Sequence, residues 1–121
     1  MLEIPQLAII DLDDTLYDYN FANKAGEKAL NTYIATALNQ KTEVIAVELS
    51  EARLSLKSRL ADTASSHSRL LYVREFLNSN RIQIHSSFAL ECEQVFWREY
   101  LDNSILYPGV KDFLTYLRLR K

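Results

Sequence analysis

The fold depends most on the stretch Leu7-Ala8-Ile9-Ile10-Asp11-Leu12-Asp13-Asp14-Thr15-Leu16-Tyr17. Its short apolar run, closed by polar residues, is typical of a strand buried on both faces of a parallel sheet. In open α/β sheets, ligands bind outside the carboxyl ends of the strands. Because side chains alternate along a strand, Asp11 and Asp13 should point to the same side. Two neighbouring carboxylates repel unless a cation lies between them or one keeps its proton. The stretch therefore predicts a hard divalent cation, with a nucleophile beside an acid/base group.

These acidic residues have two other interpretations. Asp and Thr are common where strands turn into loops, since their short side chains bond to nearby backbone, so an isolated Asp-x-Asp indicates little. A calcium loop would place glycine at its sixth position and a bidentate Glu at its twelfth. Those positions hold Leu16 and Ala22, which excludes the calcium loop.

The string Ile9-Ile10-Asp11-Leu12-Asp13-Asp14-Thr15-Leu16-Tyr17-Asp18 resembles the first motif of the haloacid dehalogenase-like (HAD) hydrolase superfamily. It is most similar to phosphatases with a helical cap, such as the pyrimidine 5′-nucleotidase and phosphoglycolate phosphatase groups. The resemblance implies an α/β fold, a Rossmann-like core with a cap inserted soon after its first strand. It implies that Asp11 is the nucleophile that forms an aspartyl-phosphate and that Asp13 is the general acid/base. Mg²⁺ would be held by the Asp11 carboxylate and the Asp13 backbone carbonyl, and Thr15 would support the phosphate or the turn. Phosphoryl transfer needs these parts: an in-line nucleophile, a cation and a proton donor.

The segment after Tyr17 is helical in pattern. Apolar residues recur at helical spacing in four stretches with short connections, which predicts an antiparallel bundle of four helices. The first helix is expected from about Asn20 to Leu38, Thr42 is the expected N-cap of the second, and residues 61–68 are an expected break. Cys92 lies on an apolar stripe and should be a packed thiol.

The domain boundaries follow from the string Tyr107-Pro108-Gly109-Val110, which predicts a turn. It is similar to the string that marks the return from cap to core in HAD proteins. We expect the first core strand and flap at 1–19, a helical cap at 20–104 and a truncated return to the core at 105–121. The chain itself should be mostly α-helical, with one core strand.

The resemblance covers only the N-terminal half of a HAD protein. A complete member continues through strands that carry a phosphate-binding Ser/Thr, a Lys and further acidic residues, whereas this sequence stops at Lys121. A lone strand lacks ladder partners, and an independent sheet usually needs three or more strands. A homo-oligomer, a complementing C-terminal chain or an artefactually shortened sequence would each account for this. Since removing one electrostatic contact commonly costs about 10²–10³ in rate, an isolated monomer should be inactive.

Composition narrows the class of protein. The 121 residues are 48% hydrophobic and 25% charged, which is typical of a globular domain. A formal charge of −2 gives no electrostatic case for nucleic acid. No apolar stretch approaches the roughly 20 residues of a membrane span. Residues 1–5 lack the features of a signal peptide, and a single cysteine fits a reducing compartment, so we expect a cytoplasmic protein.

Three functions remain open. The first is a Mg²⁺-dependent phosphatase that acts on a small phosphorylated metabolite. The second is a non-catalytic helical cap, an oligomerisation module or a truncated remnant. The third is a protein that binds Mg²⁺ or a small molecule through Asp11 and Asp13 without turnover, although two oxygen ligands fill little of an octahedral shell.

Several other residues could serve the site. The stretch 65–69 could face the active site, and Arg69 could meet an anionic substrate group, although a solvated arginine is the simpler interpretation. His67 and His85 are expected to be surface or loop residues rather than catalysts. Tyr100 is expected in the core or an interface, and Tyr17 lies where the resemblance implies a mobile flap.

Overall fold

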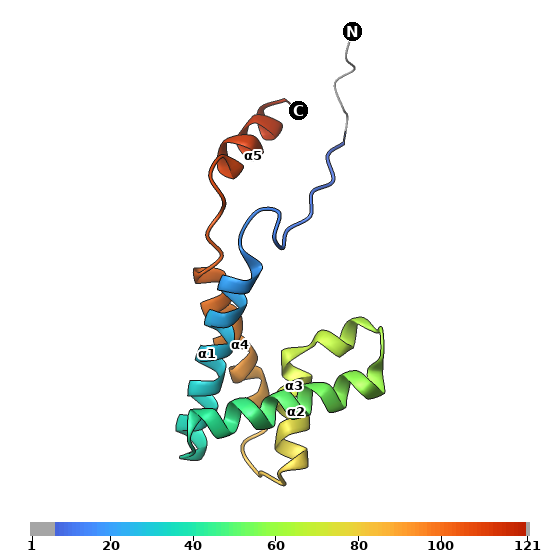
Figure 1. Ribbon diagram of the computed structural model, residues 1–121, viewed down its shortest axis with the longest axis vertical. Helices are drawn as coiled ribbons and strands as arrows, with labels where there is room; N and C mark the ends of the chain where they lie inside the picture. The colour runs from blue at the N-terminus through green and yellow to red at the C-terminus, as the bar shows by residue number, and fades with distance from the viewer. Residues whose placement is uncertain (1–6, 121) are drawn as a thin grey trace.

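A computed structural model describes residues 7–120 (Figure 1). These residues form five α-helices and one short 3-10 helix: α1 (Tyr19–Leu38), α2 (Thr42–Leu60), η1 (Ala64–His67), α3 (Arg69–Ser79), α4 (Phe88–Asp102) and α5 (Val110–Leu119). Residues 1–6 and 121 lie outside the described residues. Residues 1–5, which bear on the prediction that the chain has no signal peptide, and residue 121, the last of the predicted return segment, are among them.

The predicted α/β fold is wrong for the described residues, which are helical and contain no strand. Residues 7–12 are irregular, and the side chains of Leu7 and Ile9 are 75% and 91% exposed. Between residues 7 and 120 the sheet-like pairings are isolated bridges, from Tyr17 to Asp13 and to Leu106. An apolar run becomes a strand only where other strands accept its backbone hydrogen bonds, and this part of the chain supplies none. The core strand expected at the start of the chain is therefore not formed.

The four helices expected between residues 20 and 104 are present as α1 to α4. The carboxylate of Asp18 caps α1 by accepting a hydrogen bond from the Phe21 N–H at 3.0 Å. The helix ends at Asn39, whose φ of 51° is left-handed. The prediction of Thr42 as the N-cap of α2 is wrong by one residue, because Lys41 is the N-cap and Thr42 is the first helical residue.

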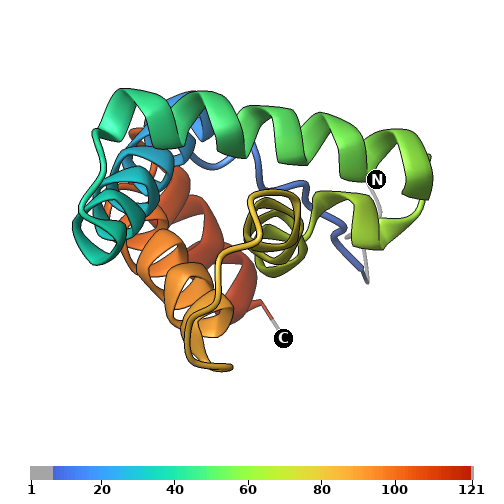
Figure 2. The same cartoon turned by 90° about the horizontal axis from the view of Figure 1, so that it is seen from below.

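The helices do not form a simple antiparallel bundle. In Figure 1, α1 and α4 run side by side in opposite directions, while α2 crosses them near one end. Figure 2 shows the same crossing from below, and α3 packs against both α2 and α4. Cys92 is fully buried, as expected. Most of the buried side chains from these four helices form one core cluster, which includes Ile34, Ile45, Phe76, Phe88, Phe96 and Tyr100.

Two segments extend from this core, and the first is joined to it by Tyr17, which packs against the core cluster. Residues 7–18 and α5 both extend beyond the same end of the α1–α4 pair (Figure 1). α5 has no buried residue, and its Phe113, Tyr116 and Leu119 side chains are exposed. Among the described residues, no helix has both the length and the apolar character needed to cross a membrane.

Candidate functional site

The acidic motif forms a tight turn rather than a strand end. The N–H groups of Thr15 and Leu16 donate to the Leu12 carbonyl at 3.2 and 2.9 Å. Asp14 takes a left-handed φ of 57°, which Asp tolerates better than most residues. Its Oδ1 accepts a hydrogen bond from the Tyr19 N–H at 2.9 Å. Asp14 therefore fastens the turn to the first residue of α1.

Asp11 directly precedes this turn and is exposed. The Thr15 hydroxyl donates to Asp11 Oδ2 at 3.2 Å. The contact brings together two of the three residues predicted for the site. It orients the carboxylate through Oδ2 and leaves Oδ1 for a ligand or for attack on one.

Asp13, the third predicted residue, contacts two tyrosine hydroxyls instead. The Tyr17 hydroxyl donates to Asp13 Oδ1, and the Tyr100 hydroxyl donates to the same oxygen at 3.2 Å. The two hydroxyl oxygens are 2.8 Å apart, so the single proton of the Tyr100 hydroxyl is shared between Asp13 Oδ1 and the Tyr17 oxygen. The two rings meet edge to face with centroids 6.1 Å apart. Tyr100 comes from the last turn of α4 and is 5% exposed. A core side chain thus positions an exposed carboxylate.

The protonation of these tyrosines follows from their surroundings. Burial, the hydrogen bond to Asp13 and the nearby acidic charges raise the pKa of Tyr17 above its ordinary value. Burial, the hydrogen bond to Tyr17 and the charge of Asp13 raise the pKa of Tyr100 strongly. Both hydroxyls therefore keep their protons at neutral pH and can serve as donors to Asp13.

The segment before α5 also touches the acidic turn. The Tyr107 N–H donates to the Leu16 carbonyl at 2.9 Å, and Leu106 forms the bridge with Tyr17. The turn is thus held by the start of α1, which directly follows it, and by the end of α4 and residues 106–107, which are distant in sequence. The role of Tyr100 was missed because helical spacing predicts burial and says nothing of a hydroxyl partner 87 positions away.

A pocket of about 310 Å³ opens between α1, α2 and η1. Its lining includes the charged side chains of Glu27, Arg53 and Arg69, together with His67. Tyr19 lines it as well, and the Tyr19 ring lies 6.2 Å from that of Tyr100, centroid to centroid. Tyr19 therefore links the pocket to the acidic turn, since its side chain lines the pocket and its N–H donates to Asp14 Oδ1.

Arg69 is held firmly in this pocket. Its guanidinium donates to the His67 carbonyl at 3.1 Å and to Asn23 Oδ1 at 3.0 Å. The guanidinium carbon lies 4.5 Å from the centroid of the Phe96 ring and 5.6 Å from that of Trp97. The stretch 65–69 thus brings Arg69 and His67 to one cavity, where sequence alone left a solvated arginine as the simpler interpretation.

A metal would find only part of a coordination shell here. Across residues 7–120, no three His, Cys, Asp or Glu side chains are grouped so that they could hold a metal ion. The Asp11 carboxylate and the Asp13 carbonyl are hard oxygen donors, which suit Mg²⁺ in kind. They would fill two of its six positions, and water, substrate or other protein groups would have to fill the rest.

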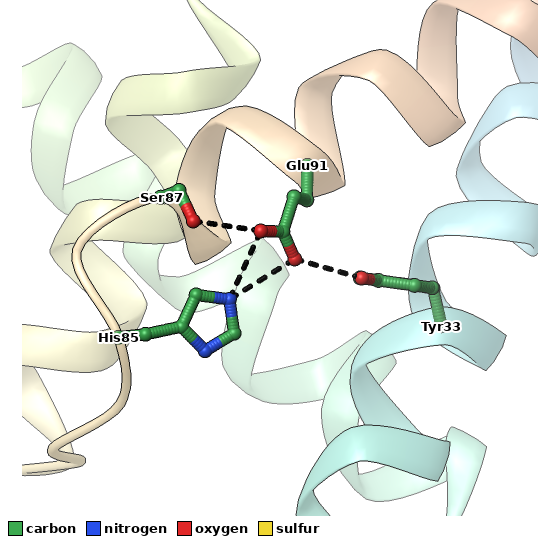
Figure 3. A network of polar contacts seen from close by, with 4 residues as sticks. All are labelled: Tyr33, His85, Ser87 and Glu91. Atoms are coloured by element: carbon green, nitrogen blue, oxygen red, sulfur yellow. Dashed lines mark hydrogen bonds and ion pairs between the residues drawn. The ribbon is translucent and has the colours of Figure 1, made fainter.

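A separate polar network lies at the start of α4 (Figure 3). Glu91 accepts hydrogen bonds from Ser87 Oγ at 2.7 Å and from the Tyr33 hydroxyl at 3.0 Å, and His85 Nε2 lies 3.0 Å from its Oε1. The hydrogen bonds from Ser87, His85 and Tyr33 lower the pKa of Glu91. His85 lies in the connection between α3 and α4, which confirms that it is a loop residue. The network fastens that connection to α1.

The chain is similar to a ribulose-1,5-bisphosphate 5-phosphatase of Halopiger xanaduensis, with 31% identity over 111 residues. The aligned region covers 91% of this chain and 46% of the relative, so the chain spans about half the length of the curated protein that it matches. No family model matches the chain, and no solved structure does.

Proposed function

We propose that this chain is the N-terminal portion of a HAD-type phosphatase that depends on Mg²⁺ and works through an aspartyl-phosphate. The observation that carries the proposal is the acidic turn itself. It presents Asp11, oriented by Thr15, and Asp13, oriented by two tyrosine hydroxyls, within three residues of each other. The similarity to a protein named as a phosphatase supports the same class of reaction.

The proposed reaction has two steps. The Asp11 carboxylate attacks phosphorus, and the bond between phosphorus and the leaving oxygen breaks as Asp13 gives that oxygen a proton. Asp13 then takes a proton from the water that attacks the aspartyl-phosphate, which releases phosphate and restores both carboxyl groups. A bound Mg²⁺ would neutralise the oxygens of the transferring phosphoryl group.

The neighbours of the two carboxylates fit these roles. The Thr15 hydroxyl engages Asp11 Oδ2, so Oδ1 is the attacking oxygen. Tyr17 and Tyr100 both donate to Asp13 Oδ1, so Oδ2 is the oxygen that carries the proton in transit. Each aspartate thus has one oxygen that is held and one that reacts.

The substrate is proposed to be a small phosphorylated metabolite. The relative's name specifies a sugar bisphosphate, which makes that class the first to test. A pocket of about 310 Å³ beside the turn is of a size suited to a small molecule.

The site is proposed to need residues beyond those described. Two oxygen donors do not complete a Mg²⁺ shell, and the chain covers 46% of its relative. A longer form of this chain, a complementing C-terminal chain or a second copy would supply the rest. Steady-state turnover by an isolated monomer should therefore be negligible.

The test uses the chain in excess over an aryl phosphate with Mg²⁺, so that even one slow turnover is seen. We expect phosphate release that a chelator abolishes and that Asp11→Asn slows at least about 10²-fold. Asp62→Asn, in an exposed loop, removes the same charge and should leave the rate unchanged. A wild-type rate no higher than that of Asp11→Asn would remove Asp11 from the mechanism.

A second candidate is a non-catalytic helical module that associates with other chains. The exposed apolar side chains of α5 favour it, because such surfaces tend to be covered by a partner. Light scattering at several concentrations tests this candidate. A strictly monomeric protein would count against it.

A further inference from the structure

We infer that the pocket between α1, α2 and η1 binds an anionic group of a small organic molecule, through the guanidinium groups of Arg53 and Arg69. The inference rests on the proposed function only for the ligand, which would be the metabolite whose phosphate reacts at the acidic turn. The anionic group would be a second phosphate or a carboxylate at the other end of that metabolite. Binding of an anion in the pocket itself needs no turnover.

The charges in the pocket favour an anion. Its lining holds two guanidinium groups against one carboxylate, that of Glu27, and adds the imidazole of His67. Among the described residues, the hydrogen-bond acceptors of Arg69 are both neutral, a backbone carbonyl and an amide oxygen. Within residues 7–120, neither arginine of the pocket takes part in an ion pair. A guanidinium carries five N–H donors, so Arg69 retains donors for a phosphate or carboxylate.

The Arg69 guanidinium is also held in position before any ligand binds. Arg69 is the first residue of α3, and the Ser68 hydroxyl before it caps the helix by accepting from the Leu71 N–H at 3.3 Å. The buried Ser66 is fixed by its carbonyl, which accepts from the Tyr72 hydroxyl at 2.6 Å. The Arg69 side chain is then stacked on the Phe96 ring. Because little freedom is left to lose, binding costs less conformational entropy than it would for a mobile surface arginine.

The position of the pocket connects it to the proposed chemistry. Tyr19 lines the pocket, its ring contacts that of Tyr100, and the Tyr100 hydroxyl holds Asp13. A metabolite whose phosphate lies at the acidic turn would extend past Tyr19 toward Arg53 and Arg69. A molecule with anionic groups at both ends matches this layout. A molecule that is neutral at the end away from the acidic turn would leave the charges of Arg53 and Arg69 unpaired.

The direct test titrates the 121-residue chain with inorganic phosphate in the presence of a chelator, so that no metal brings phosphate to the acidic turn. Trp97, the single tryptophan, lies beside Arg69 and reports binding by fluorescence, and calorimetry gives an independent Kd. We expect saturable binding that Arg69→Gln weakens about tenfold or more and Arg53→Gln about fivefold, since each removes a charged donor. Arg74→Gln, on the exposed side of α3, removes the same charge and should change the Kd less than about twofold.

Several outcomes decide the matter. Equal Kd values in Arg53→Gln, Arg69→Gln and Arg74→Gln, or no saturable binding at all, would overturn the inference. Circular dichroism shows whether Arg69→Gln still folds; if it does not, the exposed Arg53→Gln decides alone.

The inference and the proposed function can fail separately. Asp11→Asn should leave the phosphate Kd unchanged. Phosphate bound at Arg53 and Arg69, in a chain whose phosphate release does not need Asp11, would support the pocket and sink the proposed function. Release that needs Asp11, with a half-saturating chain concentration that neither arginine affects for a doubly anionic substrate, would do the reverse.

Discussion

Asp13 is an exposed carboxylate whose position depends on a buried residue. Tyr100 packs in the core through its ring, in contact with Phe96 and Trp97, and places its hydroxyl at the edge of that core. Ring and hydroxyl thus belong to different environments, which is common for buried tyrosines. The stability of α4 and the geometry of the acidic turn are joined at this one side chain.

Replacing Tyr100 by Phe should therefore have two effects. Loss of the hydrogen bond should lower the free energy of unfolding by about 1 kcal/mol and slow phosphate release, because Asp13 loses one of its two positioning donors. The raised pKa of Tyr100 means that its neutral form stabilises the fold below pH 10 and that this stability is lost as the pH rises above the unfolded-state value of 10.0.

Urea unfolding at several pH values measures both effects. The loss of stability above pH 10 should be shallower in Tyr100→Phe than in the wild type, because one titrating group has been removed. Tyr116→Phe on the exposed side of α5 is the matched control. Identical pH profiles for wild type and Tyr100→Phe would contradict the linkage.

At the scale of elements, α1 and α4 pack closely at Gly26. A Cβ at this position would lie 2.8 Å from Phe96 Cε2 and 3.0 Å from the Phe96 backbone oxygen. The Phe96 ring is buried between other groups, among them Tyr100 and the Arg69 guanidinium, and has little room to retreat. Gly26 therefore provides space for the Phe96 ring and backbone, and its backbone freedom is not needed here.

Gly26→Ala should destabilise the protein, although alanine has a higher helix propensity than glycine. Alanine normally stabilises a helix interior by about 1 kcal/mol relative to glycine, but overpacking here should lower the free energy of unfolding by about 1–3 kcal/mol. Denaturant unfolding measures the change. Ala37→Gly, on an exposed part of α1, isolates the propensity effect and should cost at most about 1 kcal/mol. A Gly26→Ala variant more stable than the wild type would refute the close packing.

The elements also show what sequence could and could not predict. The helices were predictable because an amphipathic helix carries its own hydrogen bonds and its apolar stripe is written in local spacing. The prediction of a strand at 7–10 was wrong because a strand needs partner strands, which the local sequence pattern does not reveal. The crossing of α2 over α1 and α4, and the meeting of Tyr100 with Asp13, depend on how helices pack and have no signature in spacing.

For the whole molecule, the main feature is a closed helical core with two unpacked segments at one end. Residues 7–12 and α5 expose Leu7, Ile9 and Phe113 among other apolar side chains, on the same side as the acidic turn (Figure 1). An exposed apolar surface of this kind favours association. Under the proposed function, whatever covers it would also bring the groups that complete the Mg²⁺ shell and neutralise the phosphate.

The most direct test of the central claim is to look for phosphate on Asp11. The chain is mixed with excess aryl phosphate and Mg²⁺, quenched in acid, reduced with borohydride to trap the acyl phosphate, and mapped by mass spectrometry. The account predicts modification of the peptide that contains Asp11, absent with a chelator and in Asp11→Asn. Modification at another residue, or none at Asp11 while phosphate is still released, would contradict it.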